Sequence, residues 1–177
     1  MRNIVLIGMP AAGKSTIGVI LAKVLGLRFM DSDLLIQEQE QCLLKDIIAR
    51  DGIDGFMDIE NQVNRDISVV NSVIATGGSI VYGREAMEHL REIGLVVYIR
   101  LSYETITTRL GNIKQRGVVL REGQNLCSLY EERCPLYERY AHIVIDGEDL
   151  GTEELMEKIA DAVVKYDAKN GTDLHSI

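Results

Sequence analysis

A short glycine-containing stretch near the start of the chain has the residue types and spacing of a phosphate-binding loop. Gly8 through Ser15 matches the pattern G-x-x-x-x-G-K-[ST]. The glycines let successive backbone N–H groups point inward around an anion, while Lys14 can reach the β- and γ-phosphates and Ser15 can bind Mg²⁺. The stretch therefore predicts a site for ATP or GTP, formed by Gly8, Ala11, Ala12, Gly13, Lys14, Ser15 and Thr16.

Two carboxylates follow the next short apolar segment of the chain. Asp31 is suited to the coordination shell of Mg²⁺, directly or through water. Asp33 is suited to orient, or take a proton from, a hydroxyl that attacks the γ-phosphate. Either carboxylate could instead simply cap the helix that follows. Further along, Gly77-Gly78 presents a backbone surface that a second substrate can approach closely, although the same pair could be only a tight turn.

Three arginines are candidates for binding negative charge. Arg109, Arg116 and Arg133 could offset phosphate charge or hold an anionic substrate. A single arginine on a helix is usually solvated, so none of them establishes a site by itself.

The segments that must position these residues alternate between strands and helices. Apolar runs predict strands at 4–7, 27–30, 72–76, 95–99 and 142–145. Helical spacing predicts helices at 16–25, 34–41, 43–50, 53–67, 84–93, 103–110, 126–140 and 152–166. Strands that are apolar throughout and alternate with helices predict a three-layer α/β fold, with a parallel sheet covered on both faces. Ligands of such sheets bind beyond the carboxyl ends of the strands, where the phosphate loop, the two aspartates and the glycine pair all fall.

Composition bounds the class of protein. The 177 residues suit about one domain, and 19 basic against 27 acidic residues give a net charge of −8. This charge argues against nucleic acid or a membrane surface as a partner. Three cysteines without metal or disulfide spacing, no secretory leader pattern and no long apolar run predict a cytoplasmic protein that acts on a small molecule.

Taken together, these motifs resemble the shikimate kinase family of nucleoside monophosphate kinase-like P-loop kinases. The resemblance runs from Asn3 to about Lys165 and rests on 8–16, 30–33, 52–60, 77–78, Arg109, Arg116 and 133–137. It implies a P-loop kinase fold with a five-stranded parallel sheet, ATP and Mg²⁺ as ligands, and a mobile lid at about 111–124. It also implies a substrate-binding segment at about 33–61. We expect a single domain over 1–167, a frayed tail over 168–177, and a monomer or weak dimer.

The resemblance also implies roles for individual residues. By position, Asp33 would bind the reacting hydroxyl, Arg133 the substrate carboxylate, Arg116 the phosphates, and Arg109 the adenine. Lys14, Asp33 and Arg116 would then be catalytic, and Ser15 and Asp31 would hold the metal. The acceptor would be bound by Asp33, Met57, Gly77, Gly78, Ser79 and Arg133.

Two positions depart from the family pattern. The family's substrate segment reads Phe-Arg-x-x-Glu, and its arginine is a second clamp on the carboxylate. The same frame here runs from Phe56 to Glu60 and carries Met57 in place of that arginine. A thioether has no charge, so we expect a weaker hold on the carboxylate of shikimate. The family's triple glycine is Gly77-Gly78-Ser79 here.

The leading hypothesis is an ATP-dependent kinase of the shikimate kinase type, acting on shikimate or a similar small alcohol. The alternatives are a kinase for a less anionic acceptor and a non-catalytic, nucleotide-binding regulatory homologue. A nucleoside monophosphate kinase is disfavoured because the stretch after the third strand lacks an arginine-containing base-binding pattern. A GTPase is disfavoured because the sequence has no Asn/Thr-Lys-x-Asp motif.

Overall fold

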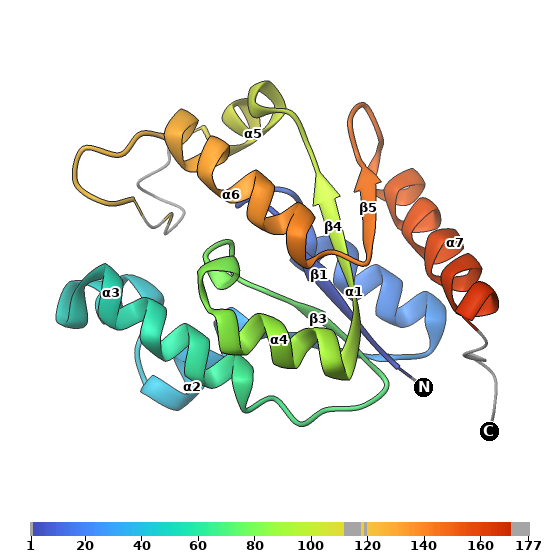
Figure 1. Ribbon diagram of the computed structural model, residues 1–177, viewed down its shortest axis with the longest axis horizontal. Coiled ribbons are helices and arrows are strands. Elements are labelled where there is room, and N and C mark those ends of the chain that lie inside the picture. The colour runs from blue at the N-terminus through green and yellow to red at the C-terminus, as the bar shows by residue number, and fades with distance from the viewer. Residues whose placement is uncertain (1, 112–117, 119, 171–177) are drawn as a thin grey trace.

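A single parallel sheet forms the centre of the molecule (Figure 1). The computed structural model describes residues 2–111, 118 and 120–170. The strands lie in the order β2-β3-β1-β4-β5. They are β1 (Asn3–Ile7), β2 (Arg28–Asp31), β3 (Ser72–Ala75), β4 (Gly94–Arg100) and β5 (Ile143–Asp146). The predicted five-stranded parallel sheet is confirmed.

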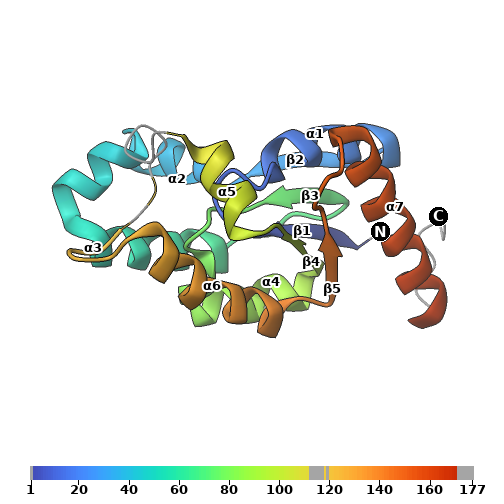
Figure 2. The same cartoon turned by 90° about the horizontal axis from the view of Figure 1, so that it is seen from above.

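Helices cover both faces of this sheet, as Figure 2 shows. Helices α1 and α7 lie on one face, and α4 and α6 lie on the other. The helical elements are α1 (Lys14–Leu25), α2 (Ser32–Glu40), α3 (Leu44–Arg65), η1 (Ile80–Tyr82), α4 (Arg84–Ile93), α5 (Tyr103–Leu110), α6 (Leu126–Tyr140) and α7 (Thr152–Asn170). The predicted three-layer α/β fold is therefore confirmed.

The three central strands are largely apolar and buried because helices shield both faces of the sheet from water. Val5 of the central strand pairs with Ile74 of β3 and with Val96 of β4, and all three side chains are fully buried. This main core fixes the carboxyl ends of β1, β2 and β3 relative to one another. Each of those ends leads into a segment that sequence analysis identified as a candidate site.

Helices α2 and α3 pack around a small core of their own. Ile36, Ile47, Phe56 and Val63 form this second cluster, separate from the main core. Inside α3, Gly52 has non-helical dihedral angles (φ 73°, ψ −177°), so the predicted break in this helix is confirmed. The left-handed φ favours glycine at this position. The pair of helices lies at one end of the sheet (Figure 1), and α3 also packs against α4 and η1.

Element boundaries differ from the predictions at two places that matter later. Helix α2 begins at Ser32, earlier than expected, because Asp31 caps it: Oδ1 of Asp31 accepts a hydrogen bond from the backbone N–H of Asp33 at 3.0 Å. Asp33 therefore lies in the first turn of the helix. Helix α7 continues to Asn170, beyond the predicted domain end at residue 167. The remainder of the predicted tail, 171–177, lies outside the described residues.

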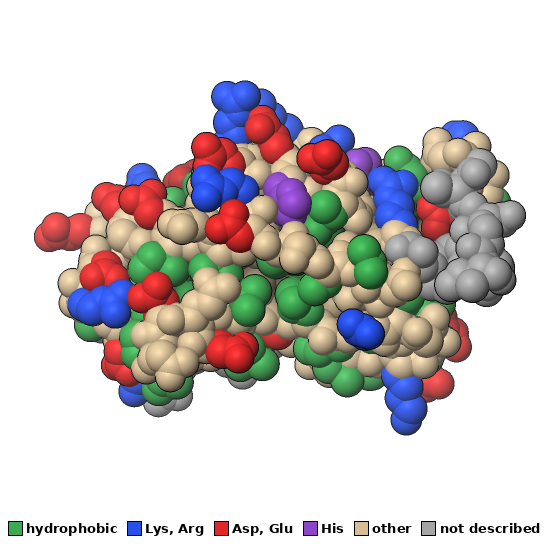
Figure 3. Space-filling view, turned by 90° about the horizontal axis from the view of Figure 1, so that it is seen from below, with side chains coloured by type: hydrophobic (Ala, Val, Ile, Leu, Met, Phe, Trp, Pro, Cys, Tyr) green, Lys and Arg blue, Asp and Glu red, His purple; other side chains and the backbone are tan. Residues whose placement is uncertain are grey.

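The outer surface carries charges of both signs. Figure 3 shows acidic and basic side chains mixed over one face of the molecule, with small apolar areas between them. Within residues 2–111, 118 and 120–170, none of the helices is both long enough and apolar enough to cross a membrane.

Candidate active site

The phosphate-binding loop lies between the end of β1 and the start of α1. Two of its glycines are required by the backbone. Gly13 has φ 91°, and Gly8 has φ 148° with room for no side chain, since a Cβ would lie 2.8 Å from the carbonyl oxygen of Ile99. The first N–H groups of α1 have no partners within the helix and point toward the loop, which makes this end of α1 suited to an anion.

Lys14 is held beneath this loop. Its Nζ donates hydrogen bonds to the carbonyl oxygens of Gly8 at 2.8 Å and Met9 at 3.0 Å. Burial lowers the pKa of Lys14 to about 8, and the nearby Asp33 carboxylate opposes that shift. The ammonium group is therefore positioned before any phosphate arrives.

A candidate metal site joins the start of α1 to the end of β2. Ser15 Oγ donates a hydrogen bond to Asp31 Oδ2 at 2.6 Å, so two oxygen ligands meet there. Among the described residues, no group of three or more His, Cys, Asp or Glu side chains could hold a metal ion. A pair of protein oxygens fits Mg²⁺, which keeps several waters and takes its other ligands from phosphates.

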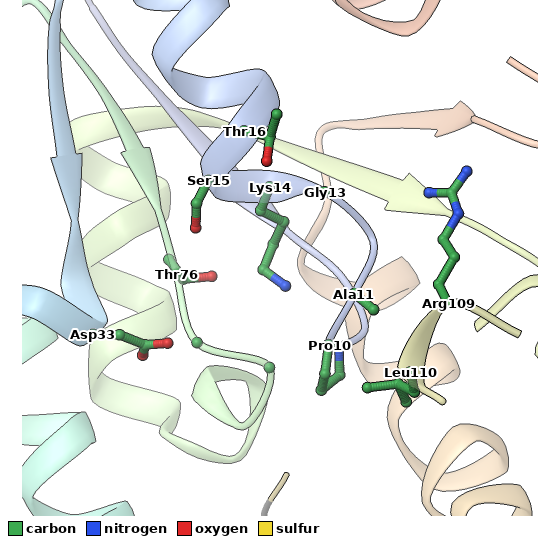
Figure 4. A pocket seen from close by; sticks show the side chains of 12 residues that line it. Pro10, Ala11, Gly13, Lys14, Ser15, Thr16, Asp33, Thr76, Arg109 and Leu110 are labelled. Carbon is green, nitrogen blue, oxygen red and sulfur yellow. The ribbon is translucent and has the colours of Figure 1, made fainter. Parts of the chain in front are cut away.

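A cavity of about 550 Å³ opens above the loop (Figure 4). Lys14 and Asp33 point into it, and Arg109 of α5 lies across it from Asp33. Its size suits a nucleotide phosphate chain with part of the nucleoside. It is lined by Pro10, Ala11, Gly13, Lys14, Ser15, Thr16, Asp33, Thr76, Gly77, Gly78, Arg109 and Leu110.

A second, tighter hollow adjoins this cavity on the side of α3 and α6. Its free volume of about 30 Å³ is the space of about one water molecule. It shares Pro10, Asp33, Gly77 and Gly78 with the larger cavity. Its other lining residues are Leu44, Phe56, Glu60, Ser79, Val118 and Arg133. The residues that line both spaces therefore stand between a nucleotide site and a second site.

Glycine is needed at the boundary between the two spaces. A Cβ at Gly77 would lie closer than 3 Å to both Asp33 Oδ1 and Glu60 Oε1. A Cβ at Gly78 would lie 2.8 Å from Pro10 and 3.2 Å from Nη1 of Arg133. Charged side chains thus pack directly onto this backbone, and even a methyl group would displace them.

Two tyrosines fix the wall formed by α6. The guanidinium of Arg133, which is 1% exposed, lies 5.2 Å from the ring centroid of Tyr82. Arg133 Nε also donates a hydrogen bond to Tyr82 Oη at 3.3 Å. The hydroxyl of Tyr137 donates to the carbonyl oxygen of Gly78 at 2.5 Å. These contacts position Arg133 and the glycine backbone together.

The two carboxyl groups of the second hollow both hold protons more tightly than usual. Burial, with a contribution from Asp31, raises the pKa of Asp33 to about 6, while Lys14 opposes this rise. Burial raises the pKa of Glu60 to about 7, although a hydrogen bond with Ser79 lowers it. A carboxylate with a pKa near 6 can accept a proton from a hydroxyl at neutral pH.

The structure brings most of the predicted site residues to these two spaces. Gly8, Ala12 and Asp31 line neither space. Met57 does not line the second hollow; it lines a neighbouring surface hollow with Asn61 and Tyr82. Arg116 and most of the predicted lid lie outside the described residues.

Sequence reasoning missed several residues that line the two spaces. In the nucleotide cavity these are Thr76 and Leu110, and in the second hollow they are Leu44, Phe56 and Glu60. The frame from Phe56 to Glu60 was itself a signal, because its acidic end falls on the buried side of an amphipathic helix.

Comparison with known proteins identifies relatives over nearly the whole chain. A family model described as shikimate kinase matches residues 10–164. The chain is 33% identical over 167 residues to shikimate kinase 2 of Yersinia enterocolitica, covering 89% of this chain and 93% of that protein. It is 37% identical over 165 residues to a shikimate kinase of Rippkaea orientalis, covering 91% and 87% respectively. The structure of shikimate kinase from Acinetobacter baumannii in complex with shikimate superposes with a TM-score of 0.86 at 32% identity, covering 94% of each chain.

We predict that Lys14→Ala lowers the rate of ATP-dependent phosphotransfer at least about 100-fold, because it removes the buried cation aimed at the phosphates. The comparison uses turnover together with the melting temperature of each protein. Lys23→Ala, an exposed change in the last turn of α1, is the matched control and retains activity. A folded Lys14→Ala protein with wild-type turnover would contradict this role for the loop.

Proposed function

The chain belongs to the shikimate kinase family, and on that premise we propose that it transfers the γ-phosphate of ATP to a hydroxyl of shikimate. Members of this family are ATP-dependent phosphotransferases that act on a small molecule. The observation that carries the proposal is Asp33, which lines both the nucleotide cavity and the adjoining hollow. A hydroxyl bound at Asp33 is therefore next to the phosphate that it attacks.

The phosphates would be bound by the loop and by Lys14. Backbone N–H groups at the start of α1 and the Lys14 ammonium meet the anion, and Arg109 at the cavity edge suits the adenine. Ser15 and Asp31 would hold Mg²⁺, which, when bound, offsets negative charge on the phosphates. Arg116 would reach the phosphates from the predicted lid.

The acceptor would be held between Asp33 and Arg133. Asp33 accepts the proton of the attacking hydroxyl, and its raised pKa of about 6 is close to the working pH of a general base. Arg133 is suited to a planar carboxylate, because its guanidinium is fixed against Tyr82 and lines the hollow. Gly77 and Gly78 let the acceptor lie against the backbone.

Entry of the acceptor would require a movement of α2 and α3. The hollow has a free volume of only about 30 Å³, which is too small for a six-membered ring with its substituents. Leu44, Phe56 and Glu60 of α3 line it, and Leu44 and Phe56 belong to the second cluster. We propose that these helices shift outward, with Gly52 as a pliable point in α3.

Location and assembly are also part of the proposal. ATP supply fits a cytoplasmic enzyme, and a net charge of −8 disfavours nucleic acid as a partner. We propose a monomer or weak dimer.

The direct test is identification of the product formed from ATP and shikimate, by phosphorus NMR. We expect a phosphate monoester of shikimate together with ADP. In Asp33→Asn, kcat should fall about 100- to 10,000-fold, since general-base assistance is lost, while KM for ATP changes little. Asp58→Asn, on the exposed side of α3, is the control. Shikimate left unchanged while another alcohol is phosphorylated would assign a different acceptor, and the absence of ATP turnover with every acceptor would favour the regulatory alternative.

A second prediction concerns Met57, which carries no charge where the family has an arginine. We expect Met57→Arg to raise the preference for shikimate over its uncharged methyl ester about tenfold or more, measured as a ratio of kcat/KM. A charge-assisted hydrogen bond to the carboxylate contributes about 1.5–3 kcal/mol. Met57→Leu should leave the ratio unchanged. An equal ratio in wild type and Met57→Arg would show that position 57 does not reach the carboxylate.

A further inference from the structure

Arg133 is the one cation among the described residues that line the second hollow. Two acids, Asp33 and Glu60, line the same hollow. Ionised acids repel an acceptor that carries a negative charge, so its attraction depends on the guanidinium of Arg133. A planar guanidinium binds a carboxylate well only when its N–H groups point at the carboxylate oxygens. The orientation of Arg133 is therefore decisive for an anionic acceptor.

Tyr82 sets that orientation through two different contacts. The guanidinium lies over its ring, with 5.2 Å between Cζ of Arg133 and the ring centroid. Tyr82 Oη accepts a hydrogen bond from Nε of Arg133 at 3.3 Å, which limits rotation of the guanidinium. Nη1 lies 3.2 Å from the point where Gly78 would carry a Cβ, so a terminal nitrogen faces backbone that lines the hollow.

Tyr82 is itself held in place. It belongs to η1, which packs against α6, and its backbone N–H donates to the carbonyl oxygen of Ser79 at 3.0 Å. Its hydroxyl also hydrogen-bonds the carboxylate of Glu132, which accepts a hydrogen bond from Gln124 Nε2 at 2.9 Å. A carboxylate only accepts, so the hydroxyl proton is directed at Glu132 and an oxygen lone pair at Nε of Arg133.

The ring of Tyr82 also separates Arg133 from two other carboxylates. Tyr82 lines the neighbouring surface hollow of about 170 Å³, which Arg133 does not line. Asp58 and Glu85 line that hollow together with the uncharged Met57. Removal of the ring would let the guanidinium turn toward these carboxylates and away from the acceptor.

We infer that Tyr82 is a positioning residue that directs Arg133 at the acceptor and thereby sets the preference of this protein for an acceptor with a carboxylate. Tyr82 lines neither the nucleotide cavity nor the second hollow, so it acts through Arg133. The inference rests on the proposed function, because it presumes that Arg133 meets the carboxylate of the acceptor.

The test compares kcat/KM for shikimate with kcat/KM for its uncharged methyl ester. Tyr82→Phe removes only the hydroxyl, and we expect the preference for the acid to fall about threefold or more. Tyr82→Leu also removes the ring, and the preference should fall about tenfold or more. The value for the ester should stay within about threefold of wild type. The loss should appear as a higher KM for shikimate with little change in kcat, since the carboxylate is bound equally before and during the reaction.

Tyr140→Leu is the matched control. Tyr140 lies at the end of the same helix α6, with Cζ of Arg139 at 5.8 Å from its ring centroid, and neither residue lines the two spaces. This change removes the same kind of arginine–tyrosine contact and should leave the preference unchanged. The melting temperature of each variant shows whether it is folded.

A purely structural role for Tyr82 predicts equal losses on the acid and the ester, and that result would overturn the inference. If Tyr82→Leu does not fold, Tyr82→Phe decides alone, and an unchanged preference in that variant would also overturn it.

The outcomes distinguish this inference from the proposed function. Phosphorylation of shikimate with the wild-type preference in both Tyr82 variants would overturn the role of Tyr82 and leave the proposed function standing. No phosphorylation of shikimate by wild type would contradict the proposed function. The dissociation constants of the acid and the ester, measured by calorimetry, would then decide the role of Tyr82. Tighter binding of the acid that Tyr82→Leu abolishes would support it, and equal binding by wild type would overturn it.

Discussion

The site depends on the burial of charged groups around a stretch of backbone that has no side chains. Lys14, Asp33, Glu60 and Arg133 are all wholly or largely removed from water, and all approach Gly77 and Gly78 or the neighbouring loop. Burying an isolated charge costs several kcal/mol, so these groups stabilise one another through opposite charge. Burial lowers the pKa of Lys14 and raises the pKa values of Asp33 and Glu60. As a result, these side chains are already oriented before the substrates bind.

The fold divides this task between two hydrophobic clusters. The main core fixes β1 and β3, and with them the phosphate loop and the glycine pair. Helices α2 and α3 carry Asp33 and Glu60 and share a second small cluster, while α3 also packs against α4 and η1. The main core thus positions the nucleotide side of the site, and α2 and α3 carry the acceptor side.

The sequence alone was sufficient for the parts of the protein that depend on local pattern. The phosphate loop has a fixed spacing, and continuous apolar strands alternating with helices are typical of a covered parallel sheet. The sequence was insufficient where the answer depends on how a helix is turned. In α3, both Met57 and Glu60 fit an amphipathic pattern, yet Glu60 lines the hollow and Met57 lines its neighbour. The kink at Gly52 changes the direction of that helix, and periodicity does not determine such a rotation. Likewise, the contact of Arg133 with Tyr82 joins residues far apart in sequence.

The most direct measurement of the central claim uses Gly77→Ala. The backbone at Gly77 does not require a positive φ, so the added methyl group acts only by occupying the space between Asp33 and Glu60. Binding of ATP by calorimetry and kcat/KM for shikimate are compared with wild type. The account predicts an ATP dissociation constant within about threefold of wild type, and a kcat/KM at least about 100-fold lower, because the displaced carboxyl groups no longer align the acceptor. A Gly77→Ala protein with undiminished kcat/KM would contradict it.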